Sequence, residues 1–306
     1  MGVWSWSVAL LLLLVLSGGR ARAAMEHRWL TLGGGLEAAR YADEDPFRFQ
    51  RAKAFSSSLF GSAGAGERWL AAAGWTDQRL RQEGSAAWLE EDGWEYRGLQ
   101  RTLWLTRAVT PGWGVEALGH GSSTRLAWTE AGRAREESRH GWLVGGGLSW
   151  SPHPATGRPL VLGIRLARLR PAHREAEGGR IHVAELNLRR PLGAGSGRIA
   201  LLATRSEEGL KLAGLARGAA VVGAGRLGLH ASLLAGRLDH WYDVERLVVH
   251  DGPRPLRAAI GVGLDFKMGA GWSLSAATGW ERVEDHESRW LYLGTRWSRQ
   301  IWAVVP

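Results

Sequence analysis

Two histidine–serine pairs have the spacing that a nucleophilic hydroxyl and its base require. They are His120-Gly121-Ser122 and His230-Ala231-Ser232. Residues i and i+2 of a β-strand share one face, so each imidazole could reach its hydroxyl and remove the proton. Glu116 and Glu130 are the acids nearest to His120 in the sequence that could orient the base. Because the motif is short and occurs twice, ordinary polar side chains are the alternative interpretation.

Other candidate motifs are weaker. Asp239-His240 and Asp285-His286 could form acid–base pairs in loops, but such dipeptides also arise by chance on a polar surface. The glycine-rich stretches at 193–197 and 222–226 lack the Lys-Ser/Thr ending of a phosphate loop and are interpreted as turns. The chain has no cysteine, and we expect no metal site and no cofactor. The catalytic residues stay unknown, and the sequence favours a function other than catalysis.

Apolar and polar residues alternate with a period of two, which is typical of β-strands. Trp142 and Trp150 share one face of such a segment, as do Trp272 and Trp280, and each pair is eight residues apart. Eight residues of extended chain span about 26 Å, or about 20 Å along the membrane normal at a tilt of about 40°. An outer-membrane barrel has an apolar belt about 25 Å tall with an aromatic girdle at each edge. We therefore predict that each tryptophan pair marks the two edges of a membrane.

The same alternation recurs along the chain. It is clear at 160–167, 210–217, 226–236 and 257–267. Weaker examples lie near 28–38, 67–76, 98–107, 112–119, 124–130, 180–189, 197–205, 239–249 and 289–298. Residues 39–66 show no clear pattern and are interpreted as a long loop or a poorly patterned hairpin. The pattern predicts an all-β fold, an antiparallel up-and-down transmembrane β-barrel of about 12–14 strands.

A soluble β-sandwich or propeller also alternates apolar and polar residues. Two features count against it. The second face of each segment is mostly Gly, Ala and Ser rather than charged, as the crowded or wet lumen of a barrel requires. The chain also contains 18 Trp and 43 Gly, and paired tryptophans at the two ends of one face have no evident use in a soluble core.

The first residues are typical of a signal for export. Val8 to Leu16 is an apolar run, and it is followed by the small-residue exit Ala21-Arg22-Ala23. A run of this length is too short to span a membrane as a helix. We predict that residues 1–24 are a cleaved signal peptide and that residues 25–306 form the barrel domain. Translation from Met25 is the alternative.

The last strand resembles the closing strand of Gram-negative outer-membrane β-barrels. The segment RWLYLGTRWSRQIW, residues 289–302, has a glycine among alternating aromatic residues. The chain then continues to Pro306 instead of ending on an aromatic residue, which departs from that pattern. The resemblance implies an outer-membrane location, contact with outer-membrane lipid and lipopolysaccharide, and insertion by the barrel-assembly machinery. Export makes nucleic acid an unexpected partner.

Charged side chains on the small-residue face are the candidates for function. The chain has 39 basic and 30 acidic residues, and residues 151–306 hold 22 and 14 of them. The predicted lumen residues are Arg165, Lys211, Arg217, Arg257, Lys267, Asp265 and Glu281, with Glu185 as a further acid. They could favour passing anions, or they could pair with one another and fill the lumen with salt bridges. The predicted girdle residues are Trp142, Trp150, Trp272, Trp280, Trp290 and Trp297.

Three functions follow from this pattern. The first is a pore or small-solute transporter that favours anions. The second is a structural or assembly barrel of an envelope complex. The third is a barrel enzyme acting on lipid A or peptides, because outer-membrane lipid A deacylases use a similar His-x-Ser pair and omptin proteases use Asp and His at the rim. The absence of a strong catalytic motif disfavours the third function.

Overall fold

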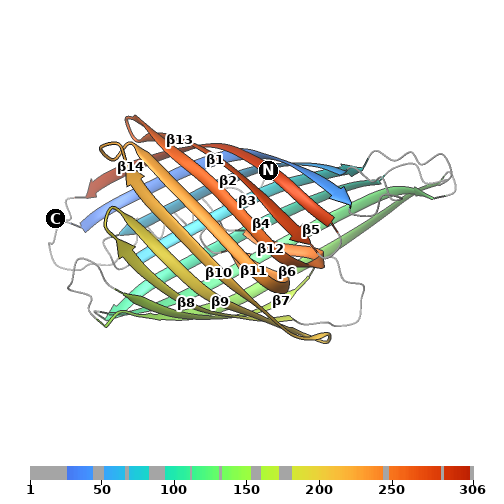
Figure 1. The fold of residues 1–306 in the computed structure, drawn as a ribbon, viewed down its shortest axis with the longest axis horizontal. Helices are drawn as coiled ribbons and strands as arrows, with labels where there is room; N and C mark the ends of the chain where they lie inside the picture. Colours follow the sequence, from blue (N-terminus) through green and yellow to red (C-terminus); the bar gives the residue numbers. More distant parts are fainter. Residues whose placement is uncertain are drawn as a thin grey trace.

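A computed structural model of the chain contains fourteen antiparallel strands that close into a barrel (Figure 1). Each strand pairs with its neighbours in sequence, and β1 pairs with β14. The structure describes residues 26–43, 52–65, 69–82, 94–110, 112–130, 133–152, 160–171, 181–243, 248–283 and 286–303. The strands are β1 (Glu26–Asp43), β2 (Ala52–Ala65), β3 (Trp69–Gln82), β4 (Trp94–Thr110), β5 (Trp113–Glu130), β6 (Arg133–Trp150), β7 (Val161–Arg170), β8 (Ile181–Leu192), β9 (Gly195–Ser206), β10 (Gly209–Val222), β11 (Leu227–Asp243), β12 (Val248–Gly269), β13 (Trp272–Val283) and β14 (His286–Ala303).

The antiparallel order gives the barrel two distinct ends. The terminal end holds the start of β1, the end of β14 and the short turns β8–β9 and β12–β13. The far end holds the opposite turns, such as β9–β10. Strands β4 to β6 are 17–18 residues long, whereas β7 to β9 have 10–12. The longer strands project beyond their neighbours at the far end, away from the C-terminus (Figure 1).

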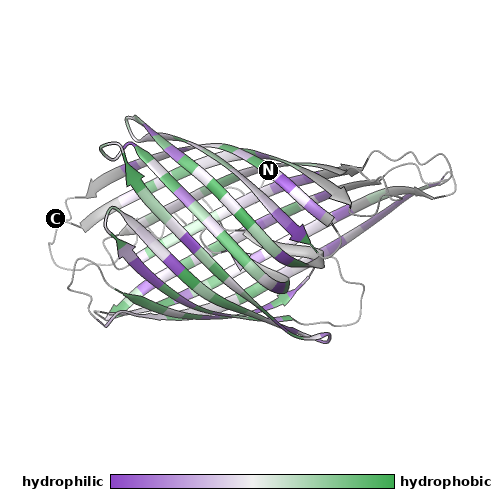
Figure 2. Ribbon diagram, in the orientation of Figure 1, coloured by the Kyte–Doolittle hydropathy of each residue, from purple (hydrophilic) through white to green (hydrophobic). Residues whose placement is uncertain are grey.

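Large apolar side chains cover the outside of the barrel. Val144 and Leu148 on β6 and Leu166 on β7 are 51–61% exposed, and Ile199 on β9 is 65% exposed. Figure 2 shows apolar and polar segments alternating along the strands in front of the barrel. An apolar surface that continues around the wall cannot face water in a stable soluble protein, because soluble monomers rarely expose apolar patches beyond a few hundred Å². The soluble sandwich is therefore excluded, and the predicted membrane barrel is confirmed with fourteen strands.

Tryptophans gather where the apolar surface ends. Trp150, Trp272 and Trp297 lie on the outer face toward the terminal end, where Trp272 and Trp297 are paired across strands. Trp142 and Trp280 lie on the outer face toward the far end, and the Trp280 Nε1–H donates to Glu287 Oε2 at 3.1 Å. These five residues lie on the outer face, and their assignment to a girdle stays a prediction. An apolar ring with one polar N–H suits the level between hydrocarbon and headgroups.

The assignment of Trp290 to the girdle is wrong. Its neighbours Leu291 and Leu293 are exposed on the outer face, so alternation turns Trp290 toward the lumen. A Cβ added at Gly279 would lie 2.4 Å from the Trp290 ring. The indole therefore lies over the glycine of the neighbouring strand, inside the barrel.

Glycines on the inner face make room for the large side chains of adjacent strands. The ring of Phe60 lies over Gly33, and the ring of Tyr292 lies over Gly35. An added Cβ at either glycine would come within 2.4 Å of the ring. Glycine at these positions thus lets bulky side chains lie flat against the wall of the lumen.

Of the two alternatives for residues 39–66, the structure shows the poorly patterned hairpin, because the end of β1 and all of β2 lie there and pair antiparallel. Residues 239–249 differ from expectation, since they contribute to the end of β11 and the start of β12 instead of one separate strand. The expected signal peptide lies outside the described residues. Among the described residues no helix is long and apolar enough to cross a membrane.

Candidate functional site

The inner face of four consecutive strands is strongly cationic. Strands β7 to β10 direct Arg165, Arg189, Arg198, Lys211 and Arg217 inward, together with one carboxylate, Glu185. Arg165 and Arg198 are 4% and 6% exposed, and Glu185 is 2% exposed. Charges removed from water to this extent need compensation. Their partners define the site.

Arg165 links three strands across the lumen wall. Its Nε donates to Glu116 Oε2 on β5 at 2.6 Å, and its Nη2 donates to Glu116 Oε1 at 3.2 Å. Its Nη1 donates to Glu185 Oε1 on β8 at 2.7 Å. Gly147 on β6 separates Arg165 from Glu116 in the register, and a Cβ there would lie 2.9 Å from the Arg165 Cγ. The side chain reaches β5 because the intervening residue is glycine.

Glu185 is the centre of a second set of contacts. The oxygen that accepts from Arg165 also accepts from Asn187 Nδ2 at 2.8 Å and from Arg198 Nη2. Trp104 Nε1 donates to Glu116 at 3.3 Å, and the Arg165 guanidinium lies 5.9 Å from the Trp104 ring centroid. These bonds fix the guanidiniums in position, since charge-assisted hydrogen bonds of this kind are short and directional.

Strand register places three arginines side by side. Arg189 is paired with Arg198, and Arg198 is paired with Arg217, so the three lie on adjacent strands β8, β9 and β10. Adjacent strands are about 4.8 Å apart, so the row spans about 10 Å. Three neighbouring cations repel one another unless anions lie between or above them. Two carboxylates supply part of this compensation, since Glu185 pairs with Arg198 and Asp243 with Arg217, and the three arginines together exceed these two acids by one positive charge.

The far end of β11 folds into the lumen. Tyr242 of β11 is 4% exposed and packs in one apolar cluster with Leu118, Leu143, Leu169 and Val183, which belong to β5 to β8. None of these strands is a barrel neighbour of β11, which pairs with β10 and β12. This end of β11 therefore reaches across the lumen and packs against the wall formed by β5 to β8.

The inward bend has a local cause. Gly236 has φ +140°, a conformation that side chains rarely adopt, and a Cβ there would lie 2.4 Å from the Ala213 Cα on β10. The register between β11 and β12 shifts after Ala235 and again after Leu238. Bulges of this kind bend a strand away from the sheet. Beyond the bend, Asp243 accepts from Arg217 Nη1 at 2.8 Å and from Nη2, which ties the inward segment to the arginine row.

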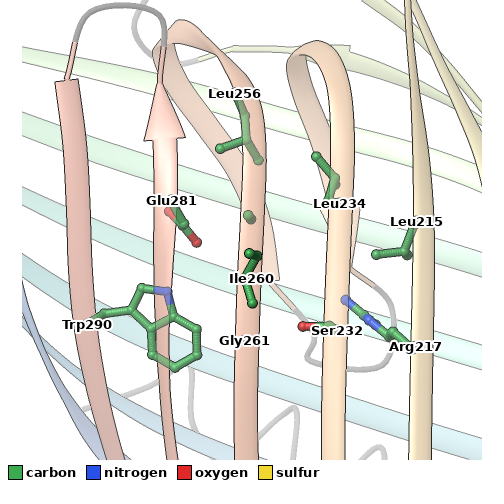
Figure 3. Close-up of a pocket in the computed structure, with 10 residues that line it drawn as sticks. Leu215, Arg217, Ser232, Leu234, Leu256, Ile260, Gly261, Glu281 and Trp290 are labelled. Atoms are coloured by element: carbon green, nitrogen blue, oxygen red, sulfur yellow. The ribbon is translucent and has the colours of Figure 1, made fainter.

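A pocket lies beside the arginine row on the inner face of β10 to β14 (Figure 3). It is a shallow recess that opens to the lumen, and its enclosed volume is about 20 Å³, enough for about one water molecule. Arg217 and Ser232 lie on one side and Glu281 and Trp290 on the other (Figure 3). The remaining lining is mostly apolar and comprises Leu215, Leu234, Leu256, Ala259, Ile260 and Gly261. The recess is too small to hold a ligand by itself, and its lining is a mostly apolar surface with a few polar groups that faces the lumen.

The other predicted lumen residues lie in different surroundings. Lys211 is 8% exposed, and its Nζ donates to Glu208 Oε2 at 2.6 Å. Asp265 accepts from Ser275 Oγ on the inner face, and Lys267 is exposed near the β12–β13 turn. Arg257 lies where the register shifts between Leu256 and Ala258 and is exposed, while Leu256 takes the inward position. The alternation of inward and outward residues fails at Arg257, because the bulge adds one residue to β12 there.

The His-x-Ser pairs face the lumen but show no catalytic arrangement in the contacts described. His120 and Ser122 are 7% and 8% exposed, and His120 Nδ1 is 2.9 Å from Thr102 Oγ1. Glu116 is bound by Arg165 instead. The His230 ring lies over Gly263. The side chains of both Asp-His dipeptides lie outside what is described, and no group of three or more potential ligands among the described residues could hold a metal.

Several site residues were not singled out from the sequence as members of this site. The inward position of Arg189 and Arg198 could have been predicted from the sequence, because alternation places both on the small-residue faces of their strands. Glu116 was considered only as a partner for His120. The role of Tyr242 and Asp243 depends on the bend at Gly236, for which the local sequence pattern gives no signal.

Comparison with known proteins identifies the architecture. No family model and no curated protein matches the chain. Among solved structures, a TodX monoaromatic hydrocarbon channel mutant is 14% identical, with a TM-score of 0.56 and 91% of each chain covered. The Pseudomonas putida toluene transporter TodX is 12% identical, with a TM-score of 0.52 over 92% of this chain and 91% of that one. A Pseudomonas aeruginosa FadL homologue is 10% identical, with a TM-score of 0.50 over 89% and 90%. The chain thus has the fold of outer-membrane β-barrels, and identities this low show the fold alone.

Proposed function

We propose that this protein is an outer-membrane transport barrel for small organic anions. The observation that carries the proposal is the inner face of β7 to β10, where five cations point inward and the ion pairs described for them involve four carboxylates, Glu116, Glu185, Glu208 and Asp243. A low-dielectric wall focuses the field of such charges into the lumen. Rings of Arg and Lys are the usual means by which pores favour anions.

The pocket beside the arginine row would favour solutes that combine an anionic group with an apolar part. Arg217 offers a guanidinium to a carboxylate or phosphate, and its ion pair with Asp243 fixes its direction. Trp290 and the leucines of the pocket offer surface to an apolar or aromatic body. The arrangement suits a small anion with an apolar part.

In the proposed mechanism the inward end of β11 controls passage. Tyr242 and the apolar cluster around it fill the lumen, so a solute can pass only when this segment moves. An incoming anion would compete with Asp243 for Arg217 and weaken the tie that holds the segment inside. A ligand shifts such an equilibrium only by its difference in affinity for the two states, and this competition supplies that difference.

The location is part of the proposal. The fold is shared with outer-membrane proteins, among them the toluene transporter TodX and a FadL homologue. We propose export through a signal peptide cleaved near Ala23 or Ala24, insertion by the barrel-assembly machinery, and contact with lipopolysaccharide. Amino-terminal sequencing of the mature protein from outer-membrane fractions tests the export step, and an intact Met1 would contradict it.

The experiment for anion transport is the reversal potential of the reconstituted protein in a salt gradient. Lys211→Gln and Arg189→Gln should each shift the reversal potential toward that of a non-selective pore. Lys211 is suited to this test because its partner Glu208 is 54% exposed and stays hydrated when the ammonium is removed. Arg205→Gln is the matched control, since Arg205 is exposed on the outer face. Cation selectivity of the unmodified protein would overturn the proposal.

A structural barrel is the second candidate, and the Arg165 network favours it. Two carboxylates and two guanidiniums in one bonded set make a rigid plug of the lumen. This alternative predicts that the protein gives no conductance in any variant that remains folded.

A further inference from the structure

Arginines form a second row on the outside of the barrel. Arg79 is paired with Arg97 and Arg97 with Arg125, so that the three lie side by side on β3, β4 and β5. Their side chains are 59%, 54% and 62% exposed. Alternation places them on the same face as the exposed Phe55 and Trp69, which is the outer face. This row is separate from the arginines inside the lumen.

The outer row lies just beyond the apolar belt. One row of paired residues runs across β3 to β6 at the far edge of the apolar belt. It consists of Trp75, Arg101, Gly121 and Trp142, each paired with the next. The outer arginine row is four residues further along the same strands. Four residues span about 13 Å, which is about 10 Å along the membrane normal at the usual tilt. The headgroup layer of a bilayer begins at the edge of the hydrocarbon and is about 5–8 Å deep. The Cα atoms of the row therefore lie about 2–5 Å beyond this layer, and the long arginine side chains can reach back to the headgroups.

The local charge is positive although acids are present. Asp77 accepts from Arg97 Nη2 at 3.0 Å and lies 3.9 Å from Arg79 Nη2, and Glu136 pairs with Arg125. Together with the exposed Arg101, the cluster holds four cations and two carboxylates. Shared carboxylates hold the guanidiniums in place and leave a net positive surface facing the lipid.

The two ends of the barrel differ in the number of arginines on the outer face. Further outward arginines follow the far edge on β7, β9, β13 and β14, namely Arg168, Arg170, Arg205, Arg282 and Arg289. At the terminal end the described outward arginines are fewer, namely Arg107, Arg190, Arg226 and Arg299. The far end thus has the stronger charge complementarity to an anionic leaflet.

We propose that Arg79, Arg97 and Arg125 bind the phosphates of a phosphorylated glycolipid headgroup, the lipid A of the outer leaflet. Guanidinium binds phosphate in a bidentate manner and stays charged at all relevant pH values. A row of three, about 10 Å long, can contact a headgroup that carries two phosphates. This site does not depend on the transport function.

The test is a titration of the purified full-length protein with diphosphoryl lipid A in neutral detergent, followed by native mass spectrometry. Each basic residue near an anionic membrane surface contributes about a factor of five in affinity, so the triple variant Arg79→Gln, Arg97→Gln, Arg125→Gln should bind on the order of a hundredfold more weakly. The affinity of the unmodified protein should fall as salt is raised. The matched control removes three outward arginines at the terminal end, Arg190→Gln, Arg226→Gln and Arg299→Gln, and should bind as the unmodified protein does.

Two further arms identify the ligand. Phosphate-free lipid A should bind as weakly to the unmodified protein as the diphosphoryl form binds to the triple variant. Phosphatidylglycerol, with one phosphate, should bind more weakly than diphosphoryl lipid A. Equal affinity of the triple variant and the unmodified protein would overturn the site, and so would an equal loss in the control. Heat-dependent gel migration verifies that every variant is folded, so a misfolded variant is recognised before it is titrated.

Discussion

Replacing Arg165 with methionine should strongly destabilise the barrel. Methionine is apolar and flexible, so the change removes the charge while leaving a side chain that can occupy the site. Arg165 donates three hydrogen bonds to two carboxylates and is 4% exposed. Removing one partner of a buried ion pair costs about 3–5 kcal/mol, because the remaining charge is left without compensation.

The contacts of Arg165 show which carboxylate loses most of its hydrogen bonds when the guanidinium is removed. Without Arg165, Glu185 still accepts from Arg198 and Asn187. Of the hydrogen bonds described for Glu116, only the one from the Trp104 indole at 3.3 Å remains. We therefore expect that Glu116→Gln in the Arg165→Met background restores about 2 kcal/mol, a coupling within the range observed for residues in one bonded network.

Urea unfolding of the refolded protein, followed by tryptophan fluorescence, gives the free energies. The control is Arg139→Met, because the Arg139–Glu137 pair is 26% and 41% exposed and such pairs contribute less than about 1 kcal/mol. If Arg165→Met and Arg139→Met lose the same free energy, then water fills the lumen around Arg165 and the reasoning fails.

Three further predictions follow from the facing of the strands and from their closure. Leu148→Arg and Leu274→Arg, on the outer face, should each lower the free energy of unfolding by about 2–4 kcal/mol, whereas Ser275→Arg on the inner face should cost less; equal losses would contradict the assigned faces. Gly279→Val places a side chain 2.4 Å from the Trp290 ring and should cost about 1–3 kcal/mol by overpacking, measured by urea unfolding, and no loss would show that the indole is elsewhere. The folded protein should migrate differently on unheated and heated detergent gels and should give a β-rich circular dichroism spectrum, and a mainly helical spectrum would refute the barrel.

The alternation of residue types predicted most of the fold, because every strand of a barrel has one lipid face and one lumen face. The faces of β6, β7, β10 and most of β12 follow directly from it. The pattern of β2 was weak because its inner face is mostly alanine and serine around Phe60, and its outer face carries few large apolar residues, among them Phe55 and Leu59. The weakness of its pattern results from the small side chains that a crowded lumen requires.

The error at Trp290 could have been avoided. Trp290 and Trp297 are seven residues apart on one strand, so they must lie on opposite faces, and Leu291 and Leu293 identify the outer one. Residue type alone suggested a girdle position, although alternation contradicted it.

The candidate site was predictable only in part. Alternation placed Arg165 and Arg217 inside, but their partners come from other strands, and register across strands cannot be deduced from a period of two. The inward fold of β11 depends on the bulges around Gly236 and on packing of Tyr242 against β5 to β8. These are tertiary contacts between residues far apart in the sequence, and no local pattern encodes them.

Single-channel recording of the unmodified protein and of Tyr242→Ala, in one salt gradient, tests the proposed transport function most directly. Tyr242 fills the lumen from β11, so its truncation should open a path through the barrel. The proposal predicts brief or rare openings for the unmodified protein, long openings for Tyr242→Ala, and anion selectivity in both. Silence from a folded Tyr242→Ala protein, or a preference for cations, would contradict it.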